Sequence, residues 1–161
     1  MKMTPLLKGI IAGTVMIGFS ILLQYTGRAN SAAAQNLFYV LFGGAIAWTL
    51  LAYYHSENYT PSFGSIFGQG FRCFIIITLI TVIFAGVNAS IHPEEKAKAL
   101  KSYAEDLKKE GNRNEAEIKK MIDSADKQFV TGQIYVAAFG TLIIGAAFTA
   151  AGAGLLLMRK K

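Results

Sequence analysis

The chain has 161 residues, of which 53% are hydrophobic, and a formal net charge of +6. Its charges are unevenly spread: residues 92–128 hold nine basic and nine acidic side chains, whereas the rest of the chain holds seven basic residues and one acid. This distribution excludes a single soluble globular domain. It also argues against a nucleic-acid-binding surface, because the excess basic residues stand beside apolar runs.

Four long runs carry no charged side chain. A helix crosses a bilayer with about 20 mainly apolar residues, and backbone amides cannot stay unpaired in lipid. We therefore expect an all-α integral membrane protein in one membrane domain, with an extramembrane helical hairpin at residues 92–128 between its third and fourth helices. The four transmembrane helices are predicted at about 6–26, 35–55, 71–91 and 129–157.

The first apolar run has two interpretations. It resembles a signal peptide, because two lysines precede it and Ala32-Ala33-Ala34 forms a small-residue cleavage pattern. However, polar residues and a long gap separate Leu23 from that pattern, which favours a retained helix. Gly9 and Gly13 form a GxxxG pair, which allows another helix to approach closely.

The segment between the second and third helices is rich in glycine and polar residues. It contains Pro61, Gly64 and Gly68, which predicts a loop or a short interfacial helix. Arg72 should then open the third helix as a membrane anchor, with a substrate-binding role as the alternative. The single cysteine, Cys73, is expected to be buried and inert.

The polar segment predicts two amphipathic helices joined by a turn. Pro93 suits a first helical position, and Gly111-Asn112 suits a helix end and a turn. Neither helix buries enough apolar surface alone, so the two stripes should face each other, a partner or the membrane surface. As candidate interaction residues we take Leu100, Tyr103, Leu107, Ile118, Met121 and Ile122.

The last apolar run is about ten residues longer than a span requires. The second hairpin helix should therefore continue into the fourth membrane helix. Small residues form surfaces for close packing on two of its faces, and on this basis Ala150→Leu should disturb assembly more than Leu156→Ala. The two faces are Ala146, Ala150 and Gly154, and Gly145, Thr149 and Ala153; the chain ends in the anchors Arg159, Lys160 and Lys161.

The motif Ile91-His92-Pro93-Glu94, followed by the hairpin and a last membrane helix, resembles a family of bacterial membrane proteins. This is the domain-of-unknown-function 4199 family, which is common among Bacteroidetes. Its usual signature is Ile-Asn-Pro followed by acids, then a run of the type matched by Glu115 to Met121. His92 stands where the family has Asn. The resemblance implies a four-helix inner-membrane protein and supplies no activity.

No sequence motif indicates catalysis. HExxH, GxSxG, the P-loop pattern and paired metal-binding cysteines are absent from the sequence, so we expect a non-enzymatic protein with no catalytic residue, cofactor or metal. The leading interpretation is an envelope or complex subunit whose periplasmic hairpin is an interaction or assembly surface. Its expected partners are the lipid bilayer and a protein or a second copy, bound through the hairpin or the small-residue faces, and not nucleic acid.

The alternative function is a small oligomeric transporter or channel subunit. Its polar lining would come from residues such as Thr78, Thr81, Asn88, Thr141 and Thr149. Charge also predicts topology, because basic residues beside membrane helices favour the cytoplasmic side. The prediction is a multi-pass protein of the bacterial inner membrane with both termini in the cytoplasm.

Overall fold

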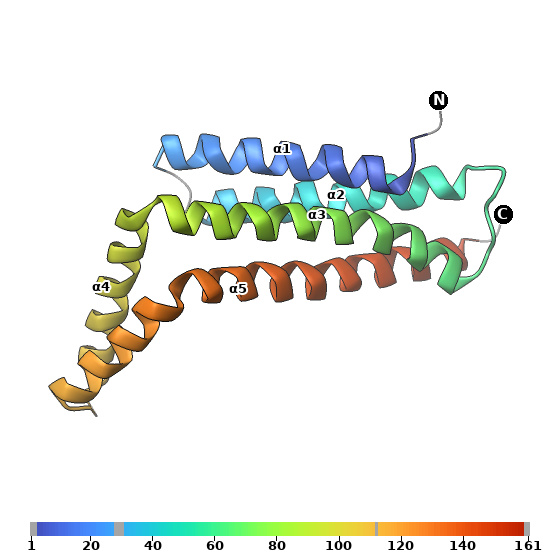
Figure 1. Ribbon diagram of the computed structural model, residues 1–161. Coiled ribbons are helices and arrows are strands. Elements are labelled where there is room, and N and C mark those ends of the chain that lie inside the picture. Colours follow the sequence, from blue (N-terminus) through green and yellow to red (C-terminus); the bar gives the residue numbers. More distant parts are fainter. Residues whose placement is uncertain (1–2, 28–30, 112, 160–161) are drawn as a thin grey trace. The chain divides into compact units, whose positions relative to one another are not determined.

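The structure, a computed structural model, describes residues 3–27, 31–111 and 113–159, and all of its regular secondary structure there is helical. Four of its helices are long and apolar enough to cross a membrane, namely α1, α2, α3 and α5. This confirms the all-α class and the four membrane-type helices. The helices are α1 (Pro5–Tyr25), α2 (Ala32–Tyr54), α3 (Phe63–Ile91), α4 (Pro93–Glu110) and α5 (Glu115–Met158), shown in Figure 1.

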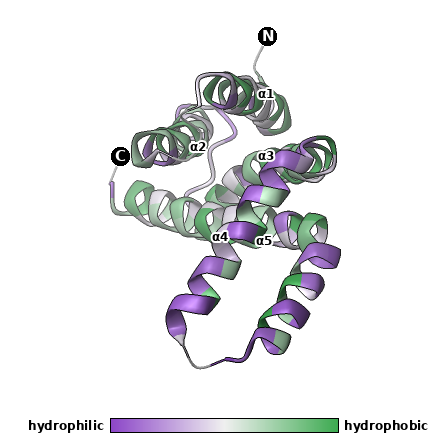
Figure 2. Cartoon of the chain, turned by 90° about the vertical axis from the view of Figure 1, so that its left-hand side faces the viewer, coloured by the Kyte–Doolittle hydropathy of each residue, from purple (hydrophilic) through white to green (hydrophobic). Residues whose placement is uncertain are grey.

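The chain packs as two compact units, Met1–Thr81 with Ala138–Lys161, and Val82–Ala137. The first unit contains α1, α2, the larger part of α3 and the last part of α5. The second contains the end of α3, all of α4 and the first part of α5. Hydrophilic residues concentrate in α4 and at the beginning of α5, while the other helices are mainly apolar (Figure 2).

Local sequence signals set the starts of α1 and α2. The Thr4 hydroxyl accepts a hydrogen bond of 3.3 Å from the Leu7 amide, and Pro5 takes the first helical position. The Ser31 hydroxyl accepts one of 3.2 Å from the Ala34 amide. These side chains satisfy amides that have no partner inside their own helix.

The beginning of α3 differs from the sequence prediction. The helix starts at Phe63 and runs for 29 residues, so the glycine-rich stretch is helical and Arg72 lies inside α3. Ile66 is fully buried in this stretch, and the rings of Phe63, Phe67 and Phe71 stack along the helix. Burial and ring packing here outweigh the low helix propensity of glycine.

The core of the first unit is apolar and is built by all four of its helices. Glycine is required where helices approach most closely. A Cβ added to Gly145 would lie 2.7 Å from the Phe74 ring and 3.2 Å from Cζ of Phe42. The core consists of Met16, Phe42, Ala45, Ile46, Leu50, Tyr54, Ile66, Cys73, Phe74, Ile77, Ala153 and Leu156.

Helix α5 runs without interruption for 44 residues. Its first part is charged, and its later part is apolar. This agrees with the prediction that the second polar helix continues into the last membrane-type helix, because the apolar run is too long for a span alone.

Candidate functional site

The strongest candidate for a binding surface lies in the second unit, between α4 and residues 115–128 of α5, which we call the polar helix pair. Capping fixes both of its helices near the turn. Gly111 ends α4 with φ of 67°, a left-handed conformation that glycine adopts without strain. The Asn114 side chain accepts from the Glu117 amide at 2.8 Å, and the Glu117 carboxylate accepts from the Asn114 amide at 3.2 Å. This reciprocal capping box starts α5.

The two helices lie side by side (Figures 1 and 2) and are joined away from the turn by an ion pair of 2.9 Å between Lys96 Nζ and Asp126 Oδ1. Nearer the turn, Leu107 and Ile118 are buried at 3% and 6% exposure. Apolar burial and an ion pair therefore hold opposite ends of the polar helix pair.

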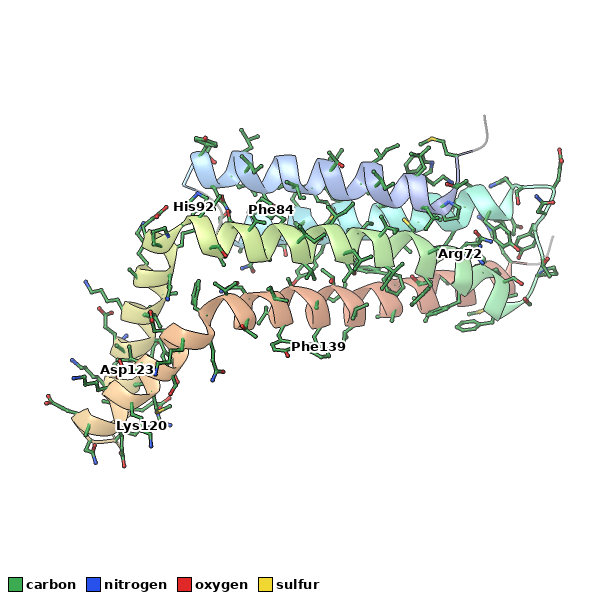
Figure 3. All side chains as sticks on the ribbon, in the orientation of Figure 1. Arg72, Phe84, His92, Lys120, Asp123 and Phe139 are labelled. Atoms are coloured by element: carbon green, nitrogen blue, oxygen red, sulfur yellow. The ribbon has the colours of Figure 1, made fainter. Side chains whose placement is uncertain are left out.

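An open groove of about 370 Å³ is lined by Tyr103 of α4 and by side chains from the first part of α5. Its lining mixes apolar, hydroxyl, amide and basic groups, and Lys120 lies on the first part of α5 (Figure 3). Tyr103 remains 38% exposed. Such a surface can bury an apolar side chain of a partner and donate hydrogen bonds to polar groups beside that side chain. The lining residues are Tyr103, Lys120, Met121, Ser124, Ala125 and Gln128.

The six candidate interaction residues separate into three environments. Leu107 and Ile118 are buried within the second unit. Tyr103 and Met121 line the groove. Leu100 and Ile122 are half-buried and do not line it. The hydrophobic stripe did not point to Lys120, Ser124 or Gln128, because helical periodicity in apolar residues carries no signal for polar side chains.

The joint between α3 and α4 contains a second group of polar contacts. Nδ1 of His92 lies 3.2 Å from the Asn88 carbonyl oxygen. Nδ2 of Asn88 donates to Oε2 of Glu95 at 3.3 Å. His92 is the N-cap residue of α4, but its side chain makes no capping hydrogen bond. These contacts link the end of α3 to the first turn of α4 through a single intervening residue.

The candidate packing residues lie in different surroundings. Gly9 and Gly13 face α3 closely, since an added Cβ would meet the Cys73 carbonyl oxygen at 2.6 Å and Ile80 Cδ1 at 2.9 Å. On α5, Ala146 packs against the core and Ala150 is half-buried, whereas a Cβ on Gly154 would have nothing within 4 Å. The more deeply buried small face of α5 is Gly145, Thr149 and Ala153.

The candidate anchors lie on or next to the membrane-type helices. Arg72 is exposed on α3 (Figure 3), and Arg159 is exposed just after α5. Lys160 and Lys161 lie outside the described residues. Lys8 gave no sequence signal beyond a flanking charge, yet it is only 6% exposed and its Nζ lies 5.2 Å from the centre of the Trp48 ring.

The potentially reactive side chains do not assemble into a catalytic group in the described part of the chain. Cys73 is buried, with Sγ 3.9 Å from the Ala45 carbonyl oxygen. His55 is engaged through Nδ1, 2.8 Å from the Leu51 carbonyl oxygen. Among the residues that the structure describes, no three His, Cys, Asp or Glu side chains come together as a metal site.

Comparison with known proteins places the chain in one family. A family model described as "Protein of unknown function (DUF4199)" matches residues 7–159. Neither the curated proteins nor the solved structures gave a significant match.

Proposed function

Given that the chain belongs to the DUF4199 family of unknown function, we propose that it is a non-enzymatic subunit of a membrane or envelope complex, with the polar helix pair as its interaction surface. In this proposal the pair is a helical hairpin outside the bilayer on the periplasmic side of the inner membrane. The observation that carries it is the open groove between α4 and α5, whose lining includes a partly exposed tyrosine and a lysine.

The composition of the polar helix pair supports a docking role. Leu107 and Ile118 are its buried large apolar residues, which is a small core for two helices. An element with so little buried surface is marginal alone and gains stability from a second surface. Tyrosine and methionine are enriched in protein interfaces, and in the groove Tyr103 and Met121 are available for such contact.

Charge asymmetry supports the orientation. With both termini in the cytoplasm, Lys8 and Arg159 stand near cytoplasmic helix ends and Arg72 in the cytoplasmic half of α3, whereas Arg28 alone stands in the short outer segment between α1 and α2. Positive flanks favour that arrangement. Alkaline phosphatase fused in the Gly111 turn should then be active, and the same reporter after Lys161 should be inactive. An active reporter after Lys161 would contradict the orientation.

The groove is tested with paired variants of the full-length protein in its native membrane. Tyr103→Ala with Met121→Ala should abolish recovery of a protein that the wild type crosslinks reproducibly, because both substitutions remove lining side chains. Lys98→Ala with Lys119→Ala is the control, since these residues are exposed and lie outside the groove lining. Equal recovery with the groove and control variants would refute the groove as the contact surface.

A second variant tests the whole polar helix pair. Replacing residues 94–126 with a Gly/Ser linker of equal length should leave the four membrane helices inserted and remove the same partner. If partner and cellular phenotype both survive, the pair is only a connector. Ion flux through liposomes containing this variant would then favour the transport alternative.

A further inference from the structure

Two basic residues of the first unit, Lys8 on α1 and Arg72 on α3, have no carboxylate partner among the described residues. Lys8 is only 6% exposed, and its Nζ lies 5.2 Å from the centre of the Trp48 ring. Arg72 is exposed on α3. Within the residues that the structure describes, neither side chain forms an ion pair. An ammonium group covered by apolar residues is unfavourable unless an opposite charge or hydrogen-bond acceptor compensates it.

The packing of α1 on α3 brings these two residues to within about one helical turn of each other along the helix axes. A Cβ on Gly13 would lie 2.9 Å from Ile80, and a Cβ on Gly9 would lie 3.0 Å from Ile76. Residues four apart share one face of a helix, so Arg72 continues the stripe of Ile76 and Ile80. One further turn along both helices places Arg72 beside Pro5, the first residue of α1. Figures 1 and 3 show this part of α3 near the beginning of α1.

The start of α1 adds a third positive feature. The N-terminal end of a helix carries a partial positive charge from its aligned peptide groups, and the first turn of α1 contains no acidic residue. The ammonium of Lys8, the guanidinium of Arg72 and the end of the helix are therefore three positive features within about one helical turn of one another. Their combined field favours an anion.

The depth of this group along the helices indicates which anion. The charge-free run of α3 begins at Cys73, directly after Arg72, so hydrocarbon contact begins there. Trp48, next to Lys8, is 44% exposed, and tryptophan prefers the level of the lipid headgroups. Lys8 lies one turn, about 5 Å, inside the start of α1, within the range over which a lysine side chain reaches toward the headgroups.

We propose that Lys8, Arg72 and the N-terminal end of α1 bind the phosphate group of an anionic phospholipid, with Trp48 packing beside its upper acyl chain. The site lies in the leaflet that contains the start of α1. The proposal requires that the apolar helices lie in a bilayer, and it is independent of any role of the polar helix pair.

The test uses the full-length protein in mild detergent and measures retained lipid by native mass spectrometry. Phosphatidylglycerol should bind more tightly than phosphatidylcholine. Each basic residue near an anionic membrane surface contributes roughly a fivefold change in affinity, so Lys8→Met and Arg72→Gln should each weaken phosphatidylglycerol binding about fivefold. Lys8→Arg should retain binding. Lys8→Met keeps a long apolar stem at this covered position, so loss of folding is not the expected result.

Two comparisons make the outcome decisive. Arg159→Gln removes an exposed basic residue that lies just after α5 and should have a much smaller effect; an equal effect would show only unspecific attraction and overturn the site. Inorganic phosphate should not displace phosphatidylglycerol at millimolar concentration, and displacement would show a site for a soluble anion instead. Unchanged binding by the Lys8→Met, Arg72→Gln double variant would also overturn the proposal.

Discussion

Nζ of Lys96 on α4 lies 2.9 Å from Oδ1 of Asp126 on α5, so this ion pair closes the polar helix pair at the end away from the Gly111 turn. The two side chains are 30% and 49% exposed. Water and salt screen such a pair, and its contribution is about 0.2–1 kcal/mol. The ion pair therefore limits how far α4 and α5 separate at this end, but its contribution is too small to stabilise the fold by itself.

Removing either partner should loosen α4 modestly. Lys96→Ala or Asp126→Ala should raise amide hydrogen exchange in the first half of α4 about twofold, the effect of roughly 0.5 kcal/mol. The charge swap Lys96→Asp with Asp126→Lys should restore protection. Lys109→Ala serves as the control, because its ion pair with Asp106 lies within α4. Identical exchange for the control and Lys96→Ala would contradict this role.

His92→Asn should stabilise the start of α4. His92 occupies the N-cap position without a side-chain capping bond, and asparagine is among the best residues there, worth about 1 kcal/mol over a non-capping residue. Amides of the first turn of α4 should exchange several-fold more slowly in the variant. His92→Ala should show no such slowing, and slowing by both substitutions would point to the loss of histidine instead of the gain of a cap.

Alanine substitutions at two glycines of α5 should have opposite effects on the stability of the protein. At Gly145 the new methyl would press on the buried Phe74 ring at 2.7 Å, so Gly145→Ala should lower stability by about 1–3 kcal/mol. At Gly140 nothing lies within 4 Å of the added atom, and Gly140→Ala should be neutral or gain up to about 1 kcal/mol from helix propensity. Thermal unfolding in detergent ranks the two, and equal melting temperatures would refute the close contact.

The burial of two other residues of α5 favours the opposite order of effects from the one expected from the sequence. Leu156 belongs to the core and is 7% exposed, so Leu156→Ala should cost about 2–5 kcal/mol. Ala150 is only half-buried, so a larger side chain there is less confined than one at a fully buried position. Ala150→Leu should therefore reduce the melting temperature less than Leu156→Ala, and the opposite order would place Ala150 in a contact within an oligomer.

Sequence reasoning identified the long helices because charge-free length is a strong local signal. It allowed a short helix in the glycine-rich stretch but did not predict that this helix is the beginning of α3, since Gly64, Gly68 and Gly70 oppose a long helix locally. Packing overrides that preference: Ile66 is fully buried, and a Cβ on Gly70 would lie 2.5 Å from Thr149. The sequence also contains a capping-box pattern, Asn114 followed three residues later by Glu117. This pattern could have predicted the start of α5, but the prediction relied on the hydrophobic residues alone.

The candidate sites were harder to predict because they depend on which faces meet. On α5 the face containing Ala146 and the face containing Gly145 consist of similarly small residues, so the sequence does not distinguish them. The structure shows that the face containing Gly145 makes the closer contact, because the Phe74 ring packs against it. The cover over Lys8 likewise comes from Trp48, forty residues away along the chain. Neither contact can be predicted from the spacing of residues along the sequence.

The balanced charge of the polar helix pair bears on how the chain reaches its final orientation. A single charge that crosses an energised membrane gains or loses about 2.3 kcal/mol per 100 mV. The nine basic and nine acidic side chains of residues 92–128 cancel, so in the proposed orientation the export of this segment would do almost no net electrical work. The membrane potential would then neither drive nor oppose its passage, and the basic residues that remain in the cytoplasm would set the orientation.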